Sequence, residues 1–264
     1  MAAEGFRFLS RILTISKNAF REAVRDRILY NLILFVLLIT ASAVFLGELS
    51  AGEEARVIVN LGLSSILIFG TFISVFVGVS LVWKEIEKRT VYSIFSKPIG
   101  RGEFIVGKYI GLCLTLFVNV AVMAAGVTLA LVYVNGGRFI GIIWPSILLI
   151  FLELTILTAV AIMFSSFSTP ALSALLTFFV FVIGHFSSSL RDLAQNLGSN
   201  SAKFFFYTVY YIMPNLSHFS FVTETATGMT APPSMLGGAF VYAIVYDIIL
   251  LTIAVVIFSR RNFK

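Results

Sequence analysis

Apolar runs separated by short polar stretches make up most of the chain. Six of these runs have about the 20 residues that cross a bilayer core as a helix, and only two charged side chains interrupt them. The runs are Ile28–Leu46, Val57–Val82, Tyr109–Val134, Phe139–Phe164, Phe167–Phe186 and Leu236–Phe258. Pro170 falls in the first turn of the fifth run, where a helix tolerates proline. The pattern predicts an all-α integral membrane protein with six transmembrane helices.

The polar stretch before the first run, residues 1–27, favours an amphipathic helix. Its basic and polar residues recur at helical spacing at Arg7, Arg11, Asn18, Arg21 and Arg25. Its apolar residues lie away from that face at Phe6, Leu9, Ile12, Leu13 and Phe20. A basic face opposite an aromatic and aliphatic face is typical of helices at the membrane surface. We expect an interfacial helix that also borders a partner. A basic flank that only orients the first span is the alternative.

The stretch between the second and third runs, a hairpin over residues 83–103, is rich in charged residues. Glu85 precedes Arg89 by four residues, the favourable order for an ion pair on a helix. A short apolar stripe at helical spacing follows at Val91, Ile94 and Phe95. The hairpin is therefore predicted to contain a short surface helix.

The end of this hairpin carries two kinds of helix-breaking residue. Pro98 ends the surface helix, because its ring disfavours the α conformation at Lys97. Gly100 and Gly102 then provide a flexible turn. We expect the chain to re-enter the membrane sharply after this turn.

The longest connection lies between the fifth and sixth runs, over residues 187–235. Within this outer loop, Phe204–Met213 is strongly aromatic but too short to span a bilayer. Tyrosine at such density is typical of the membrane interface. Pro214 and the pair Pro232-Pro233 mark the return to the last run. The loop is predicted to contain a re-entrant or interfacial helical segment.

Composition and charge agree with this pattern and orient it. Hydrophobic residues form 59% of the chain and charged residues 12%, with a mean hydropathy of +0.99, whereas soluble domains carry about 25% charged residues. Fifteen of the nineteen Lys and Arg lie before the first run, between residues 84 and 108, or after residue 259. Because cytoplasmic loops carry the excess of Lys and Arg, both termini and the hairpin are predicted to be cytoplasmic. The net charge of +6 reflects this asymmetry, and we expect no nucleic-acid partner.

Two acids, Glu153 and Asp247, lie deep inside apolar runs. A charge near the middle of a span costs at least about 2.5–3.5 kcal/mol on insertion scales. Such an acid either has a functional role facing the bundle interior or fastens neighbouring helices. The sequence offers Asn119, Thr155 or Tyr246 as hydrogen-bond partners and no evident basic partner within the membrane.

Other candidate chemistry is weaker. Gly102–Lys108 has the spacing of a phosphate-binding loop, but that loop needs Ser or Thr next, and Tyr109 follows here. We therefore expect no nucleotide site and no enzymatic activity in this chain. His185, His218 and the methionines of the outer loop have no metal-ligand spacing, so no metal site is expected.

The whole pattern resembles the membrane subunit, or permease, of type-2 ABC transporters. It is most similar to a bacterial branch linked with multicopper enzyme maturation. The resemblance rests on three stretches of the hairpin region, Glu85–Thr90, Phe95–Arg101 and Phe104–Gly111, together with Met213–Ser217 in the outer loop. Many family members have Gly-Thr where this chain has Arg89-Thr90. The resemblance covers the full length, from the interfacial helix to the sixth span.

The resemblance implies a single transmembrane permease domain over residues 1–264. Residues 28–186 would hold spans one to five, and residues 236–264 the sixth span and a basic tail. The hairpin would be the coupling helix, which contacts an ATP-binding subunit through Glu85, Glu87, Lys88, Arg89, Thr90, Phe95, Lys97, Pro98 and Arg101.

The family also implies partners and a location. Two ABC ATPase subunits would bind ATP and Mg²⁺, while this chain binds no cofactor. A second permease copy, identical or a close paralogue, and membrane lipid would complete the unit. The location would be the bacterial cytoplasmic (inner) membrane, and most relatives export or flip their substrates. An ion-gradient-driven carrier using Glu153 and Asp247, a membrane enzyme and a non-transporting scaffold are the alternatives.

Overall fold

The computed structural model describes residues 2–25, 27–48, 50, 52–87, 100–196 and 200–260. Within these residues the chain is helical and contains no strand, which confirms the all-α class. The helices are α1 (Ala2–Val24), α2 (Arg27–Glu48), α3 (Glu54–Glu87), α5 (Arg101–Tyr133), α6 (Gly137–Ser165), α7 (Pro170–His185), α8 (Ser187–Asn196), α9 (Asn200–Ile212), the 3-10 helix η1 (Leu216–Phe219), α10 (Val222–Ala226) and α11 (Pro233–Arg260).

Each of the six apolar runs lies largely in a helix. Among the described residues, α3, α5, α6 and α11 are long and apolar enough to cross a membrane, and α7 with α8 forms a fifth candidate that bends by 61°. The apolar part of α2, Ile33–Gly47, is shorter than a full span. The chain is thus a multi-pass membrane protein with four to five candidate spans, and the count of six stays a prediction.

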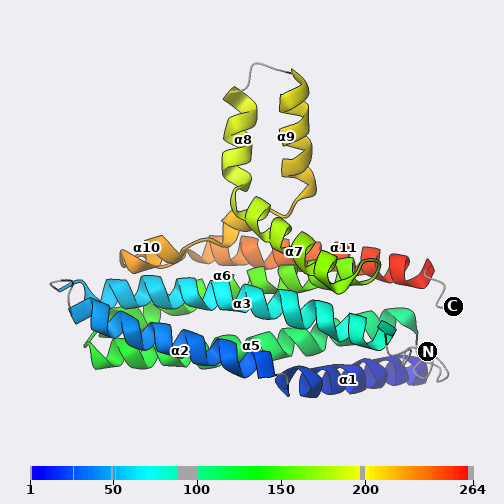
Figure 1. Cartoon of the computed structure of the whole chain (residues 1–264), viewed down its shortest axis with the longest axis horizontal. Helices are drawn as coiled ribbons and strands as arrows, with labels where there is room; N and C mark the ends of the chain where they lie inside the picture. Colours follow the sequence, from blue (N-terminus) through cyan, green and yellow to red (C-terminus); the bar gives the residue numbers. More distant parts are fainter. Residues whose placement is uncertain are drawn as a thin grey trace.

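The long helices run side by side in one bundle (Figure 1). Helix α6 lies at its centre, with 78% of its most apolar stretch buried, whereas α11 is peripheral, with 22% buried. Glycines allow close packing of α3 on its neighbours, because a Cβ at Gly70 would lie 2.5 Å from Leu154 and one at Gly62 would lie 2.7 Å from Val127. Small residues at helix crossings are typical of membrane bundles.

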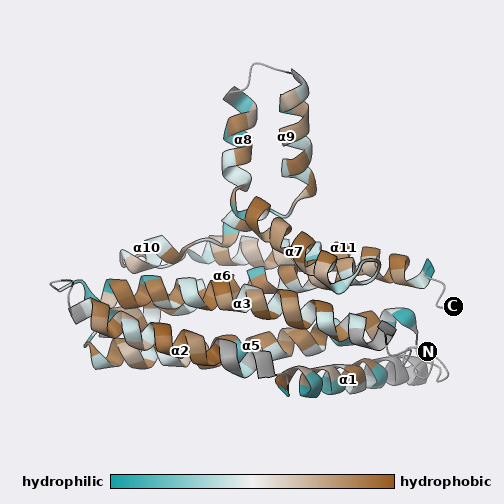
Figure 2. Ribbon diagram, in the orientation of Figure 1, coloured by the Kyte–Doolittle hydropathy of each residue, from teal (hydrophilic) through white to brown (hydrophobic). Residues whose placement is uncertain are grey.

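The two ends of the bundle differ in character. Helix α1, the start of α5 and the end of α11 lie at one end (Figure 1). At the other end Asn135, in the left-handed conformation with φ 55°, and Gly136 turn the chain from α5 into α6. Figure 2 shows apolar residues along the bundle and hydrophilic residues on α1 and α8.

The hairpin between the second and third runs differs from the prediction at both sides. Helix α3 continues through Glu87, and α5 begins at Arg101 rather than at Tyr109. The predicted turn at Gly102 is therefore wrong. The helix begins early because Gly100, in an extended conformation, is the N-cap residue, and its N–H donates to Glu103 Oε2 at 3.0 Å.

The fifth run is also shorter than predicted. Residues 166–169 form the turn from α6, and Pro170 is the first residue of α7, where its missing N–H costs nothing. The helix ends at His185, and the chain bends into α8.

The outer loop contains more regular structure than predicted. The aromatic segment forms α9, which pairs with α8 in a hairpin that projects sideways from the bundle (Figure 1). The chain then returns through η1, which contacts α6 and α7, and α10, which packs on α3. Gly184 permits this return, because a Cβ there would lie 2.7 Å from Leu216 and 2.8 Å from the Pro214 carbonyl oxygen.

Candidate functional site

Two charged side chains in the first turns of α5 join this helix to α1 and to its own start. Glu103 accepts the Gly100 N–H through Oε2 and pairs through Oε1 with Arg11 Nη1 at 3.4 Å. Lys108 Nζ lies 3.3 Å from Glu22 Oε2, with the lysine side chain 4% exposed and the glutamate 43%. These pairs lie where sequence reasoning placed a turn and the start of a span.

The glycines of the Gly107–Gly111 motif form the contact surface for α1. A Cβ at Gly107 would lie 2.7 Å from Ile15, and one at Gly111 would lie 2.6 Å from both Ala19 Cβ and the Ser16 carbonyl oxygen. Ser16 Oγ donates to the Gly107 carbonyl oxygen at 3.0 Å. The two helices therefore touch almost backbone to backbone.

This contact defines a packing face of α1 that the sequence pattern did not indicate. Its buried residues are mainly small, namely Ser16, Ala19 and Ala23, together with Ile12. Leu13, on the predicted apolar face, is 66% exposed, and its contact with lipid stays a prediction. The helix itself is confirmed, but it packs along α5, and its position at a membrane interface stays a prediction.

The first residue of α5 binds the end of α11. Arg101 Nη1 donates to the Phe258 carbonyl oxygen at 3.4 Å and to that of Ser259. The last carbonyls of a helix have no donor within the helix and carry its negative dipole end, so a guanidinium stabilises them. The rings of Phe104 and Phe258 stack beside this contact, with centroids 5.7 Å apart.

We call Arg101, Glu103, Phe104 and Lys108 the basal clamp. The clamp fixes α1, α5 and α11 to one another immediately after residues 88–99. Of the predicted coupling residues, Arg101 belongs to it, while Glu85 and Glu87 lie in the last turns of α3. The others, Lys88, Arg89, Thr90, Phe95, Lys97 and Pro98, lie outside the described residues. Residues 102–108 form part of a continuous helix, so this segment is not a phosphate-binding loop.

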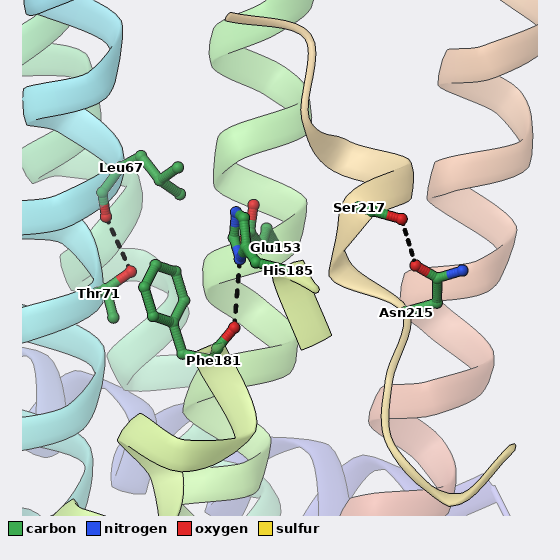
Figure 3. Close-up of polar contacts among 7 residues, drawn as sticks. All are labelled: Leu67, Thr71, Glu153, Phe181, His185, Asn215 and Ser217. Atoms are coloured by element: carbon green, nitrogen blue, oxygen red, sulfur yellow. Dashed lines mark hydrogen bonds and ion pairs between the residues drawn. The ribbon is translucent and has the colours of Figure 1, made fainter. Parts of the chain in front are cut away.

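The first buried acid, Glu153, lies at the centre of α6 and is completely buried. His185, the last residue of α7, contacts it with Nδ1 3.5 Å from Glu153 Oε1 (Figure 3). The expectation that no basic residue accompanies this acid is therefore wrong. Neighbouring hydroxyls bond elsewhere, because Thr71 donates to the Leu67 carbonyl oxygen and Ser217 donates to Asn215 (Figure 3).

The connection between α6 and α7 could have revealed this partner. The two helices are antiparallel and joined by only residues 166–169. Residues at similar distances from that turn lie near each other, since each helical residue rises 1.5 Å. Glu153 and His185 meet this condition to within about one turn.

The second buried acid, Asp247, joins α11 to α5. Tyr109 donates its hydroxyl to Asp247 Oδ2 at 2.7 Å, and Thr155 of α6 neighbours the same carboxyl group. Of the three partners predicted, only Thr155 lies there. Asn119 instead donates to the Thr115 carbonyl oxygen of its own helix, and the Tyr246 ring packs at a tilt against Tyr242, with ring centroids 4.9 Å apart. The arrangement resembles a fastening between helices.

Tyr109→Phe is expected to destabilise the protein by about 1–2 kcal/mol, because it removes the donor to a buried carboxylate. In an Asp247→Leu background the same change should cost close to nothing, since no acceptor remains. Unfolding in mixed detergent micelles would give the free energy of unfolding of each variant in this double-mutant cycle. Equal costs in the two backgrounds would show that the hydrogen bond does not couple α5 to α11.

Two cavities lie away from these acids and the clamp. One of about 280 Å³ is lined by His218, Met235 and Tyr242. The other, of about 450 Å³, lies between α3 and α10 and carries Arg56 and Asn60 on its wall. No group of three or more His, Cys, Asp or Glu side chains that could hold a metal occurs among the described residues.

The sequence matches the family described as ABC-2 family transporter protein over residues 13–263. This match covers nearly the whole chain, so the chain belongs to that family and is the membrane permease of an ABC transporter. Membership implies association with an ABC ATPase. No curated protein matches the chain.

Proposed function

We propose that this chain is the membrane subunit of an ATP-driven exporter or flippase, with residues 83–103 as its coupling helix. The basal clamp carries the proposal. Arg101 follows residues 88–99 almost directly and binds the end of α11, and Glu103 binds α1. A displacement of this segment by a partner would therefore act on α1, α5 and α11 together rather than on a loose loop.

The same clamp suggests how motion would pass into the bundle. Residues 88–99 connect the end of α3 to the start of α5, and these two helices pack closely at Gly62 and Val127. Closure of two ATPase subunits around ATP and Mg²⁺ would push this connection. Helices α3 and α5 would then shift relative to α6, and a path would open beside them.

Orientation and assembly follow from charge and exposure. The described parts of the Lys- and Arg-rich segments lie at the end of the bundle that holds α1, the start of α5 and the end of α11, which we place in the bacterial cytoplasm (Figure 1). Along α11, apolar side chains such as Phe240, Val241 and Ile248 are exposed. Lipid and a second permease copy would cover such surfaces in the inner membrane.

Reversing charge in the coupling helix is expected to release the ATPase. In Arg89→Glu/Lys97→Glu, retention of a co-expressed ATPase encoded nearby should fall at least about tenfold, equivalent to about 1.4 kcal/mol. The measurement is the ratio of ATPase to membrane subunit after purification, together with ATP hydrolysis. Retention at the wild-type level would contradict the proposed docking role.

Arg138→Glu/Arg191→Glu provides the matched control. It changes the net charge equally, and both arginines are exposed at positions away from the basal clamp. Equal ATPase loss in the control would indicate a general charge effect rather than a coupling helix.

An ion-gradient-driven carrier is the second candidate, because Glu153 and Asp247 are both buried in the bundle. ABC-2 family membership favours the ATP-driven candidate. The carrier would fail when the acids are neutralised and would work without an ATPase, whereas a non-transporting scaffold would tolerate changes at both places.

A further inference from the structure

We infer that Glu153 and His185 form a proton-binding site at the bend between α7 and α8, and that its occupancy sets the position of the α8–α9 hairpin. This inference goes beyond the proposed function, which requires no proton. It rests on the contact between the two side chains and on unpartnered atoms around them. It also rests on the position of His185 as the last residue of α7, next to the bend into α8.

The pair is short of hydrogen-bond partners. Both carboxylate oxygens of Glu153, Nε2 of His185 and Oγ of Ser187 are buried without a hydrogen-bond partner among the described residues. A bare carboxylate in a water-poor bundle is costly, so it must be neutralised by a proton or by a cation. Among the residues that the structure describes, His185 is the charged or titratable side chain that lies against it.

The geometry indicates where a proton would bind. Nδ1 of His185 lies 3.3 Å from the Phe181 carbonyl oxygen, which can only accept, so Nδ1 carries a hydrogen in that contact. The lone pair of the neutral imidazole is then on Nε2. A proton from the aqueous phase would add to Nε2, giving imidazolium beside carboxylate, or to Glu153 itself. Either product has no net charge, whereas loss of the proton leaves a net charge of −1.

Other titratable groups on the elements around α6 are engaged or exposed elsewhere. Asp247, Tyr109 and Cys113 interact with one another on the side of α5 and α11. Tyr242 and Tyr246 pack against each other on α11, while His218 and Glu224 are exposed on η1 and α10. Helix α3 has Thr71 and Ser74 in its central part, and both donate to backbone carbonyls.

Proton occupancy would act directly on the bend. His185 ends α7, Ser187 begins α8, and the 61° change of direction falls between them. The loaded pair holds the end of α7 on α6 by opposite charges when Nε2 takes the proton, and it carries no unpaired charge when Glu153 takes it. Without the proton, this contact is weaker. The α8–α9 hairpin contacts mainly itself, so little else opposes its movement.

Two measurements on the full chain in lipid nanodiscs test the site, both without an ATPase. Infrared difference spectra would follow the carboxylic-acid band as pH changes between about 5 and 8. Spin labels at Leu172 on α7 and Leu193 on α8, both exposed, would report the bend in a Cys113→Ala background. We expect a titrating band that is lost in Glu153→Gln. We also expect a label distance that changes over the same pH range, and loss of that change in both Glu153→Gln and His185→Gln.

Asp247→Asn is the matched control, because it neutralises the other buried acid and should retain both responses. A wild-type distance that does not change with pH, or a change that survives in Glu153→Gln, would overturn the inference. If Glu153→Gln does not give monodisperse protein, the spin-label distance is measured in His185→Gln instead. An absent ATPase partner would overturn the proposed function and leave these measurements unaffected.

Discussion

Gly111→Leu should displace α1 from α5 and prevent most of the protein from folding stably. A Cβ at this position would lie 2.6 Å from the Ser16 carbonyl oxygen and 2.6 Å from Ala19 Cβ, and real Cβ contacts are almost never below 3.0 Å. Because one obstacle is backbone, the neighbouring helix must move as a whole. Overpacking in cores typically costs about 1–3 kcal/mol, and this site should lie at or above the upper end. Thermal unfolding of the purified protein in detergent would measure the loss.

Gly141→Leu is the control for this prediction. It introduces the same side chain into the long helix α6, where nothing lies within 4 Å of the added Cβ. Glycine is a poor helix former, so the control should be neutral or slightly stabilising. Limited proteolysis within α1 should increase in Gly111→Leu alone. Equal thermal stability of the two variants would show that close packing of α1 on α5 does not hold this end of the bundle.

Charged residues explain where sequence reasoning succeeded and where it failed at the basal clamp. Hydrophobic periodicity was enough to predict the long helices and an interruption between α3 and α5, whereas the glycine signal placed a turn at Gly102, where α5 has already begun. Glu103 and Lys108 precede the third apolar run, which begins at Tyr109, and were therefore assigned to the region of the hairpin. Their partners, Arg11 and Glu22, precede them by many residues, and no local pattern reveals a long-range ion pair.

The face of α1 that packs on α5 was not predicted, for a related reason. A hydrophobicity pattern identifies a face of large apolar side chains, such as Leu13, which was assigned to lipid. Close approach to Gly107 and Gly111 instead requires small residues, so Ala19 and Ala23 are buried and Leu13 is exposed. The shape of the partner helix decided the face, and a single sequence does not contain that shape.

The buried acids show an intermediate case. Their cost in an apolar run already indicated a position inside the bundle, and both are indeed buried. The partner of Glu153 could have been found by counting residues from the turn between α6 and α7. The partner of Asp247 is Tyr109, on a helix distant in sequence, and it depends on how α11 crosses α5.

Arg101→Ala is expected to separate ATPase binding from movement of the bundle. The guanidinium holds the last carbonyls of α11, at Phe258 and Ser259, and hydrogen bonds to a charged group contribute about 1.5–3 kcal/mol when well shielded. Without them only the stacked rings of Phe104 and Phe258 hold the end of α11 to α5, so this end should follow α5 less closely. The ATPase should remain bound because all other residues of the coupling helix, residues 83–103, are unchanged. The ATP-driven change in distance between spin labels at Leu129 on α5 and Ile248 on α11, both exposed, should be lost.

Two further variants test whether the contact of Arg101 with the end of α11 transmits the ATP-driven movement. Arg101→Lys keeps the charge but not the planar donor fork, so it should restore only part of the movement. Arg25→Ala removes an exposed cation after α1 and should behave as wild type. Loss of the ATPase in Arg101→Ala would instead make Arg101 part of the docking surface. Wild-type movement of α11 would mean that the ATPase acts on the bundle through α3, whose last turn adjoins the same connection.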